Sequence, residues 1–292
     1  MSALELLAPA KINLFLHVGL PGADGFHPIC SLMVFADIGD RLSLAPSDRF
    51  EMELAGPFGG GLSGGEDNLV LRAARALSGH LGGGVPPMRL RLDKQLPVAA
   101  GLGGGSSDAG AALRLLRQAW APDLPDRDLE TVAASLGSDG AACLWARTVL
   151  AEGRGEVLSP APRLPVLHAV LVNPGCAVST PQVYRQFDAL DEGPRALQPD
   201  LPMVFSELDD LVEALGGLRN DLEAPAIALA PEVGEVLKAL KAQPETRFVR
   251  MSGSGATCFA LCETAGAAQA VAKRLLKAHP TWWVRACQLG MD

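Results

Sequence analysis

A glycine-rich turn placed directly before an apolar helical pattern constrains this chain more than any other stretch. The turn holds four glycines within five positions: Gly101, Gly103, Gly104 and Gly105. Ser106, Ser107 and Asp108 follow, and apolar residues from Ala109 to Trp120 recur at helical spacing. Glycine lets a backbone approach a ligand closely, and the first N–H groups of a helix attract anions. On these residues alone, a phosphate-binding loop and a simple helix cap are equally good interpretations.

The loop matches neither of the two most common nucleotide-binding motifs. It lacks the closing Gly-Lys-Ser/Thr of a Walker loop, and Ser106 stands where the dinucleotide motif has its third glycine. The segment before it alternates apolar and polar residues over 88–93, which predicts a strand buried on one face only. A second glycine run, 56–65, contains G-x-G-x-x-G and, around Ser63, G-x-S-x-G. Neither pattern there has the strand–turn–helix context that its chemistry requires.

Length and charge restrict the organisation and the partners of the chain. Its 292 residues suggest two domains, with the glycines and prolines of 153–165 at the boundary. A net charge of −8 without a basic block argues against binding to nucleic acid or to an anionic membrane. Neither a transmembrane run nor a signal peptide is expected from the apolar pattern. The six cysteines and five histidines are scattered, so we expect a cytoplasmic protein with reduced thiols and no structural zinc.

The periodicity of the remaining segments predicts an α+β protein with one antiparallel sheet. Strands are predicted at residues 12–18, 29–37, 41–45, 50–54, 88–93, 166–172, 282–287 and on both sides of the turn within 248–261. Helices are predicted from an Asp67 cap to Gly79, over 109–120, before Leu136, within 182–242 with proline breaks, and over 265–277.

Three separated segments together carry a resemblance to a known superfamily. They are Pro9-Ala-Lys-Ile-Asn13, the stretch from Pro97 to Ala109, and Ser252-Gly-Ser-Gly-Ala256. This ordered trio resembles the galactokinase, homoserine kinase, mevalonate kinase and phosphomevalonate kinase superfamily of small-molecule kinases. The resemblance implies a two-domain α+β fold, with a ribosomal-protein-S5-domain-2-like N-terminal part and a ferredoxin-like C-terminal α/β sandwich. It also implies an ATP-binding domain over 1–158 and a substrate-binding domain over 159–292.

Further motifs are similar to one family within that superfamily. These motifs are Ala8 to Leu16, Asp24-Gly-Phe-His27, Glu66-Asp-Asn-Leu69, the Gly-Gly-Gly-Ser-Ser loop, and Ala151 to Glu156. They resemble the kinases that act on 4-diphosphocytidyl-2-C-methyl-D-erythritol in the non-mevalonate isoprenoid pathway. The resemblance implies transfer of the γ-phosphoryl group of ATP, with Mg²⁺, to the 2-hydroxyl of that small molecule. The alternatives are another superfamily kinase, acting on homoserine or a mevalonate-like alcohol, and a nucleotide-binding module without chemistry.

The resemblance also implies catalytic and ATP-binding residues. Asp139 stands at the position of the family's catalytic aspartate, and Lys11 at that of the lysine that pairs with it. From the residues alone, Asp139 is a better candidate for the cap of the next helix. The implied ATP-binding residues are Asn68, Leu69, Pro97, Gly101, Gly103, Gly104, Gly105, Ser106 and Ser107. The chain offers no clear carboxylate ligand for Mg²⁺, so the metal ligands stay unassigned and Ser106 or Ser107 is a weak candidate.

The residues implied for the acceptor substrate lie in other parts of the chain. Phe26 and Tyr184 correspond to aromatics that stack on cytosine, and His27 to a residue that hydrogen-bonds its edge. The other implied contacts with the acceptor are Asn13, Asp139, Thr180, Ser252 and Gly253. Two departures from the family pattern stand out. Gly140-Ala-Ala-Cys143 replaces the usual Val-Pro and aromatics, and Phe26 replaces a more common tyrosine.

Overall fold

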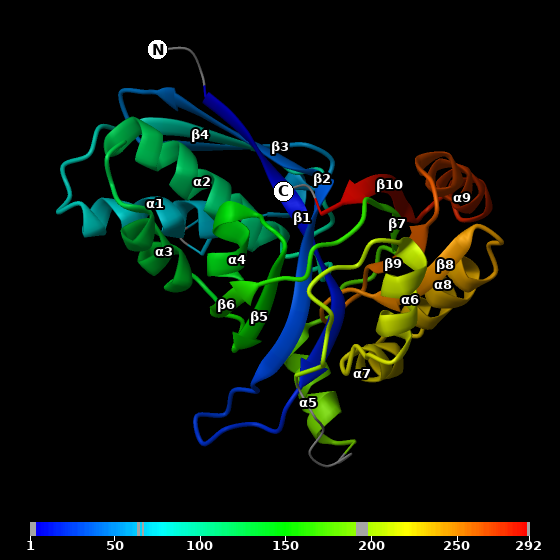
Figure 1. Ribbon diagram of the computed structural model, residues 1–292. Helices are drawn as coiled ribbons and strands as arrows, with labels where there is room; N and C mark the ends of the chain where they lie inside the picture. The colour runs from blue at the N-terminus through cyan, green and yellow to red at the C-terminus, as the bar shows by residue number, and fades with distance from the viewer. Residues whose placement is uncertain (1–3, 63–64, 66, 191–197, 291–292) are drawn as a thin grey trace. The chain divides into compact units, whose positions relative to one another are not determined.

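The computed structural model describes residues 4–62, 65, 67–190 and 198–290, and its contacts group the chain into two compact units (Figure 1). Unit 1 comprises Met1–Lys11, Ile38–Val98 and Gly103–Ala146; unit 2 comprises Ile12–Asp37, Ala99–Leu102 and Arg147–Asp292. Strands β1 (Leu4–Val18) and β2 (Ile29–Pro46) each contribute residues to both units. The contiguous domains 1–158 and 159–292 therefore stay a prediction. Ser63 and Glu66 lie outside the described residues.

In unit 1 the strand order is β3, β4, β2, with β1 beside β2. The strand β4 (Met88–Asp93) has the alternating burial predicted for it, and it pairs antiparallel with the second half of β2. Its pairing with β3 (Glu51–Ala55) is parallel, so the expectation of a purely antiparallel sheet is wrong.

The two strands predicted at 29–37 and 41–45 are a single strand, β2. The prediction broke at Ile38-Gly39-Asp40 because glycine and aspartate are uncommon inside strands. In the structure a Cβ at Gly39 would lie 2.1 Å from the carbonyl oxygen of Ala8 in β1. The glycine therefore marks a close approach of two backbones within the sheet, not its end.

Four helices pack against the strands of unit 1. They are α1 (Leu69–His80), α2 (Gly104–Trp120), α3 (Asp126–Ala134) and α4 (Gly140–Trp145), and α1 and α2 lie along one face of β3 and β4 (Figure 1). Leu90 and Leu92 of β4 share one buried cluster with Leu77 of α1 and Leu113 of α2. The predicted Asp67 cap of α1 is wrong, because Asn68 holds that position and its side chain accepts from the amide of Val70 at 3.0 Å.

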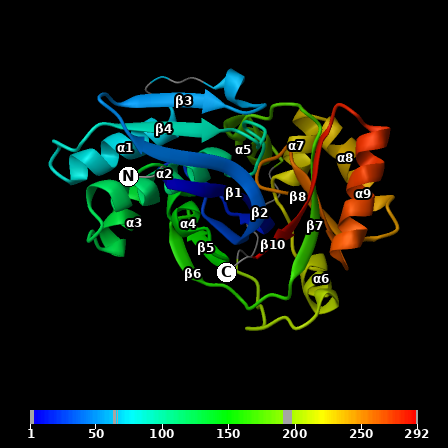
Figure 2. The same ribbon diagram turned by 90° about the horizontal axis from the view of Figure 1, so that it is seen from above.

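Unit 2 contains an antiparallel sheet in the order β10, β7, β9, β8. These strands are β7 (Leu167–Asn173), β8 (Thr246–Met251), β9 (Cys258–Cys262) and β10 (Trp283–Leu289). The helices α8 (Glu232–Lys241) and α9 (Ala265–Ala278) pack on them, as Figure 2 shows from above.

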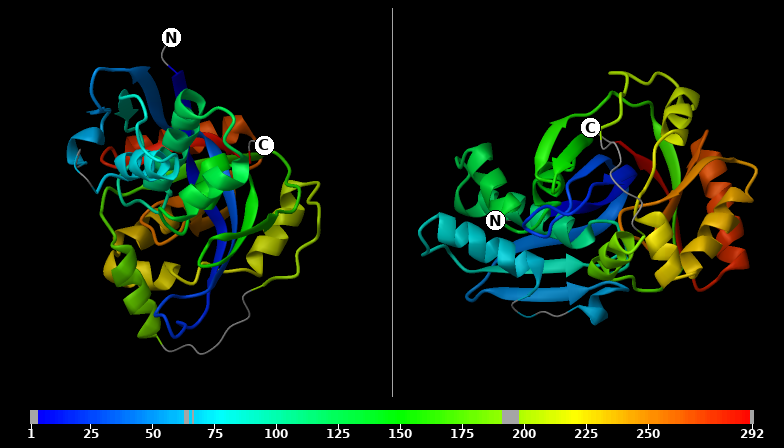
Figure 3. Two further views of the ribbon diagram at one scale, coloured as in Figure 1. Left: turned by 90° about the vertical axis from the view of Figure 1, so that its left-hand side faces the viewer. Right: turned by 90° about the horizontal axis from the view of Figure 1, so that it is seen from below.

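The region predicted to hold the domain boundary, 153–165, contains regular structure. Strands β5 (Val149–Gly153) and β6 (Val157–Pro160) form an antiparallel hairpin, and β5 pairs with the first residues of β2. Figure 3 shows this hairpin in green beside the blue strand. The proline-interrupted helical region predicted at 182–242 is confirmed as α5 (Thr180–Asp188), α6 (Leu208–Gly216), α7 (Glu223–Leu229) and α8.

One glycine sets the spacing between α2 and α4. A Cβ added at Gly110 would lie 2.5 Å from the carbonyl oxygen of Cys143 in α4. A real side chain cannot occupy that distance, so only glycine lets the two helix backbones approach so closely. Since Asp139 directly precedes α4, this contact also fixes where its carboxylate lies with respect to α2.

We expect Gly110→Ala to lower the free energy of unfolding by about 1–3 kcal/mol, because the added methyl group overpacks the contact of α2 with α4. Gly79→Ala in α1 is the matched control, since a Cβ at that position meets nothing within 4 Å. It should stabilise the protein by up to about 1 kcal/mol through helix propensity. Urea unfolding of both variants measures the difference, and equal effects at the two positions would contradict the close contact.

Candidate active site

The predicted catalytic pair is present in unit 1. The Lys11 Nζ atom lies 3.1 Å from Asp139 Oδ2, with the lysine side chain 6% exposed and the aspartate side chain 26% exposed. Asp139 occupies the N-cap position of α4, yet its side chain makes no capping hydrogen bond. Its carboxylate is directed to the lysine instead, so helix capping, the interpretation favoured by the residues alone, does not account for it.

Gly103 brings the backbone of the loop to this pair. It has a left-handed conformation with φ of +61°, and a Cβ there would lie 3.0 Å from Lys11 Cε and 3.6 Å from Asp139 Oδ2. Any larger residue would be strained in its backbone and would crowd the lysine. Gly103 also precedes α2, so an ammonium, a carboxylate and the start of a helix meet at one point.

The first turn of α2 leaves its amide groups available. The first helical hydrogen bond runs from the amide of Ser107 to the carbonyl of Gly103, so the N–H groups of residues 104–106 have no acceptor within the helix. Such groups, with the helix dipole, form an anion-binding end. The position of Gly104, Gly105 and Ser106 in this turn therefore suits a phosphate cradle.

Ser107 presents an unsatisfied hydroxyl at the same end of α2. Its Oγ atom is buried and has no hydrogen-bond partner among the described residues. Burial raises the pKa of the neighbouring Cys143 thiol to about 12, and a thiol is only a weak partner for a hydroxyl. A buried polar atom without a partner fits a ligand that supplies one, such as a phosphate oxygen or a metal-bound water.

Two residues predicted to bind ATP share a small cleft in unit 1. Leu69 and Ser106 line it, together with Ala109, Leu113 and Gly140. Asn68 is held beside it as the cap of α1, so its side chain has a structural role whatever it contacts in a complex. Pro97 is buried at the opposite end of the loop.

A buried charged cluster in unit 1 escaped the sequence analysis. The Lys94 Nζ atom lies 2.5 Å from Asp40 Oδ2 and 2.7 Å from Asp108 Oδ2, and each side chain is less than 5% exposed. Burial opposes the charge of Lys94, but the carboxylates of Asp108 and Asp40 raise its pKa above the ordinary value. Burial also raises the pKa of Asp108 above its ordinary value. The sequence Asp93-Lys94-Gln95 did not indicate a buried cluster, because polar residues after a strand are typical of its solvent-exposed end.

In unit 2 the structure brings all three resemblance segments together. Ser252 Oγ accepts a hydrogen bond from the Asn13 amide at 3.2 Å and donates one to the carbonyl of Gly101 at 3.0 Å. A Cβ at Gly101 would lie 2.4 Å from the carbonyl oxygen of Ser252. Residues more than 80 positions apart in the sequence therefore share one tightly packed turn, and Thr180 joins it through its hydroxyl, 2.7 Å from that of Ser254.

Asn220 supports this turn and was not predicted. Its amide nitrogen donates to the carbonyls of Met251 at 2.9 Å and Gly253 at 2.8 Å, while its oxygen accepts from the Leu222 amide. Asp221 anchors the same segment to β1 by accepting from the Val18 amide at 2.8 Å. The signal in the sequence was Asn-Asp before a helix, which on its own indicates only a cap.

Two of the three predicted base-binding residues lie together. The rings of His27 and Tyr184 have centroids 5.0 Å apart. His27 Nδ1 lies 2.8 Å from the carbonyl of Gly19 and must donate there, because a carbonyl only accepts. Its Nε2 atom lies 3.3 Å from Asp188 Oδ1, so this carboxylate occupies the edge of the imidazole that would meet a base.

The third aromatic, Phe26, is 56% exposed and carries a cation over its ring. The Arg154 guanidinium lies 4.1 Å from the ring centroid and also pairs with Asp24. Arg154 comes from the turn of the β5–β6 hairpin, within the region predicted to hold the domain boundary. A base that stacks on this face of Phe26 has to exchange places with the guanidinium.

We expect Asp221→Asn to lower the free energy of unfolding by about 1–3 kcal/mol at pH 7, because it weakens a buried charge-assisted network. Burial opposes the charge of Asp221, but hydrogen bonds from Arg219 and the Val18 amide hold its pKa below 3.8. A carboxylate whose pKa is lowered by folding stabilises the folded state at pH values above its ordinary pKa. This stabilisation is lost as the pH falls through the lowered pKa. The difference from the unsubstituted protein should therefore be constant from pH 8 to pH 5 and shrink below 3.8. A constant difference down to pH 3 would contradict this assignment.

Comparison with known proteins places this geometry in a family. The GHMP kinases N terminal domain matches residues 68–147, and the GHMP kinases C terminal domain matches residues 186–281. A 4-diphosphocytidyl-2-C-methyl-D-erythritol kinase of Caulobacter vibrioides is 59% identical over 291 residues, which cover 98% of this chain and 99% of the relative. One of Hyphomonas neptunium is 47% identical over 289 residues, covering 97% of this chain and 95% of the relative.

Solved structures agree with the sequence relatives. A crystal structure of a 4-(cytidine 5'-diphospho)-2C-methyl-D-erythritol kinase superposes with a TM-score of 0.80 at 35% identity, over 99% of this chain and all of that one. A homoserine kinase from Cytophaga hutchinsonii, at 19% identity, shares the fold with a TM-score of 0.69 over 98% of this chain and 95% of that one. The chain belongs to the 4-diphosphocytidyl-2-C-methyl-D-erythritol kinase family of the GHMP kinases.

Proposed function

We propose that this chain transfers the γ-phosphoryl group of ATP to the 2-hydroxyl of 4-diphosphocytidyl-2-C-methyl-D-erythritol. The observation that carries the proposal is the Lys11–Asp139 pair, 3.1 Å apart, beside the left-handed Gly103 at the start of α2. Phosphoryl transfer needs a cradle for the triphosphate, a cation near the transferred group and a partner for the hydroxyl proton. This arrangement supplies all three, and the names of the close relatives support the acceptor.

Each group has a separate part in the proposed reaction. The Asp139 carboxylate accepts or orients the proton of the attacking hydroxyl. The Lys11 ammonium holds that carboxylate in place and stabilises the charge that develops on the phosphoryl oxygens. The amides of residues 104–106 hold the phosphates, with Gly101 and Pro97 shaping the loop on its other side.

Mg²⁺ completes the proposal, because it neutralises phosphate charge when bound with the nucleotide. Among the described residues no three His, Cys, Asp or Glu side chains are grouped as metal ligands. Mg²⁺ does not need such a group, because it usually keeps several waters and is held largely by substrate phosphates. We assign Ser106 or Ser107 as the hydroxyl that would face it, and the unpartnered Oγ atom of Ser107 favours the second.

Recognition of the acceptor is assigned to unit 2. His27, Tyr184 and Phe26 would bind cytosine, once the Arg154 guanidinium leaves the ring of Phe26. Asn13 and Thr180 would contact the sugar-diphosphate portion, and Ser252 and Gly253 would approach the acceptor and the phosphates. The Asn13–Ser252 hydrogen bond supports placing these residues together.

The composition of the chain predicts its location and its partners. No described helix is long and apolar enough to cross a membrane, and all six cysteines are free thiols. We predict a cytoplasmic location and no nucleic-acid or membrane partner from the composition, whereas the small-molecule substrate follows from the kinase family.

We expect Asp139→Asn and Lys11→Met each to lower kcat by about 10²–10⁴-fold, as loss of a positioned acid–base group does. Binding of ATP by Asp139→Asn should change little, because the cradle is intact. Asp126→Asn is the matched control, since that carboxylate lies in the same unit and is 69% exposed. Steady-state kinetics with both substrates measure the effect, and turnover of Asp139→Asn near that of the unsubstituted enzyme would exclude the assigned role.

A second experiment tests the acceptor. Turnover should require the cytidine diphosphate portion, so the same alcohol without its cytidine should react poorly. Tyr184→Ala should raise KM for the cytidine substrate by about tenfold, within the range for loss of one aromatic stack, and should leave KM for ATP unchanged. Phe50→Ala, which removes another exposed aromatic, serves as the control. Equal turnover with and without cytidine would favour another alcohol as the substrate.

A further inference from the structure

Three buried charged side chains next to the loop have no direct part in the proposed phosphoryl transfer. We propose that Asp40, Lys94 and Asp108 are positioning residues that fasten both ends of the triphosphate loop to one buried point. The proposal rests on the proposed binding of ATP by this loop. The three side chains come from β2, from the residue directly after β4, and from α2, and all belong to unit 1.

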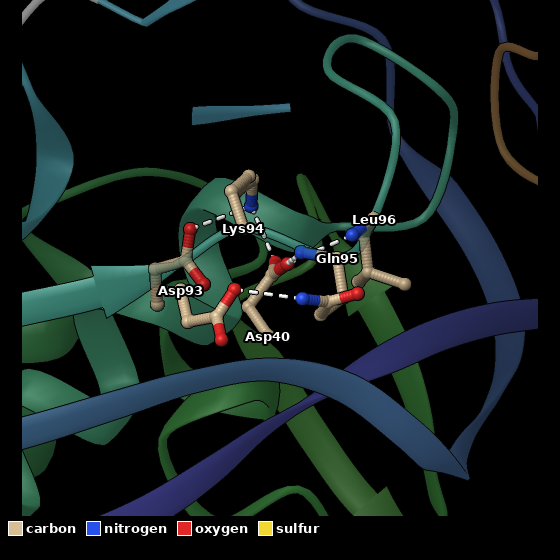
Figure 4. Close-up of polar contacts among 6 residues, drawn as sticks. Asp40, Asp93, Lys94, Gln95 and Leu96 are labelled. Atoms are coloured by element: carbon tan, nitrogen blue, oxygen red, sulfur yellow. Dashed lines mark hydrogen bonds and ion pairs between the residues drawn. The ribbon is translucent and has the colours of Figure 1, made fainter. Parts of the chain in front are cut away.

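The first end of the loop is held through its backbone. Asp40 Oδ1 accepts hydrogen bonds from the amides of Gln95 at 2.6 Å and Leu96 at 2.8 Å. The Gln95 side chain returns to Asp93 Oδ1 at 2.7 Å. Figure 4 shows these amides and the Lys94 ammonium directed at the Asp40 carboxylate. Charge-assisted bonds of this length are strong and directional, so the chain leaves β4 along a fixed path into Pro97.

The second end is held through the side chain of α2. Asp108 lies one turn inside the helix, and its Oδ2 atom accepts from Lys94 Nζ at 2.7 Å. The same ammonium reaches Asp40 at 2.5 Å. One nitrogen therefore links the residues that precede the loop with the helix that follows it.

The cluster also contacts the phosphate-binding turn itself. A Cβ at Gly104, the first residue of α2, would lie 3.1 Å from Lys94 Nζ and 3.6 Å from Asp40 Oδ2. The Lys94 ammonium therefore lies next to the backbone of Gly104, whose amide faces the proposed phosphate. A shift of the lysine would move this backbone, and misplacement of about 1 Å costs phosphoryl-transfer groups their alignment.

Stability alone does not explain buried charges here. Apolar residues of similar volume usually stabilise a core as well as or better than an ion pair or triad. The Asp108 Oδ1 atom also has no hydrogen-bond partner among the described residues, which adds a cost. Directional bonds that specify one geometry of the loop give these residues a reason to be present.

Lys94→Met is the direct test, because methionine fills the space without the charge. We expect the dissociation constant of Mg·ATP, measured by calorimetry, to rise at least tenfold and kcat to fall about 100-fold. KM for the alcohol should stay unchanged. Leu90→Ala is the matched control, because it removes a fully buried apolar side chain from β4, which ends one residue before Lys94. It should lower Tm by several degrees and leave ATP affinity unchanged in the folded protein.

Conservative variants separate positioning from simple stability. Asp108→Asn keeps an oxygen that accepts from Lys94 and should retain ATP affinity within about threefold, whereas Asp108→Leu should lose it like Lys94→Met. Gly104→Ala keeps every charge and improves helix propensity, yet it should weaken ATP binding by pushing on the ammonium. Because Gly104 itself belongs to the proposed cradle, Asp108→Leu, one turn inside α2 and outside the cradle, decides the proposal where Lys94→Met fails to fold.

The outcomes distinguish this proposal from the proposed function. Weakened ATP binding in Lys94→Met, Asp108→Leu and Gly104→Ala, with Leu90→Ala unchanged, supports the positioning role. Unchanged ATP affinity in folded Lys94→Met, in Asp108→Leu or in Gly104→Ala overturns it and leaves the kinase assignment intact. Absence of ATP binding by the unsubstituted protein overturns the proposed function, and the positioning role with it.

Discussion

A loop proposed to bind phosphate through its backbone amides must be held in place by other groups. Here those groups are carbonyls and side chains. Gly101 and Ala100 are fixed through their carbonyl oxygens, by the Ser252 hydroxyl and the Thr257 amide. Among the described residues, the backbone amides that donate to Asp40 are those of residues 95 and 96, which precede the loop. The constraint explains why so many buried polar side chains surround a stretch made almost entirely of glycine and alanine.

Local patterns predicted the elements whose partners are close in sequence. The alternation in β4 and the helical repeat of α2 depend on residues within one turn or two, and both are confirmed. The break expected inside β2 was wrong, because Gly39 is explained by Ala8, which lies on another strand. The cap of α1 was misplaced by one residue, since Asp67 and Asn68 are both good capping residues and only the three-dimensional structure distinguishes them.

The same distinction applies to the candidate site. Lys11 and Asp139 could be assigned through motifs, and the structure shows them paired. Asp40, Lys94 and Asn220 could not be assigned in this way, because each has a partner about 30 to 55 positions away in the sequence. A single charged or amide side chain in a sequence first indicates a solvent-exposed residue. Arg154 lies within the motif Ala151 to Glu156 but was given no role. The glycines and prolines of 153–165 predicted a domain boundary, whereas Arg154 lies in the turn of a hairpin.

The passage of β1 and β2 through both compact units has a consequence for how this protein can be made. A fragment that ended at residue 158 would contain the first part of β2 but lack β10, with which Ala36 pairs through Leu289. It would also lack the Arg219–Asp221 segment that binds the end of β1. During synthesis, strands made early must therefore wait for partners made last. Neither unit is a module that could be exchanged between proteins by a single cut in the gene.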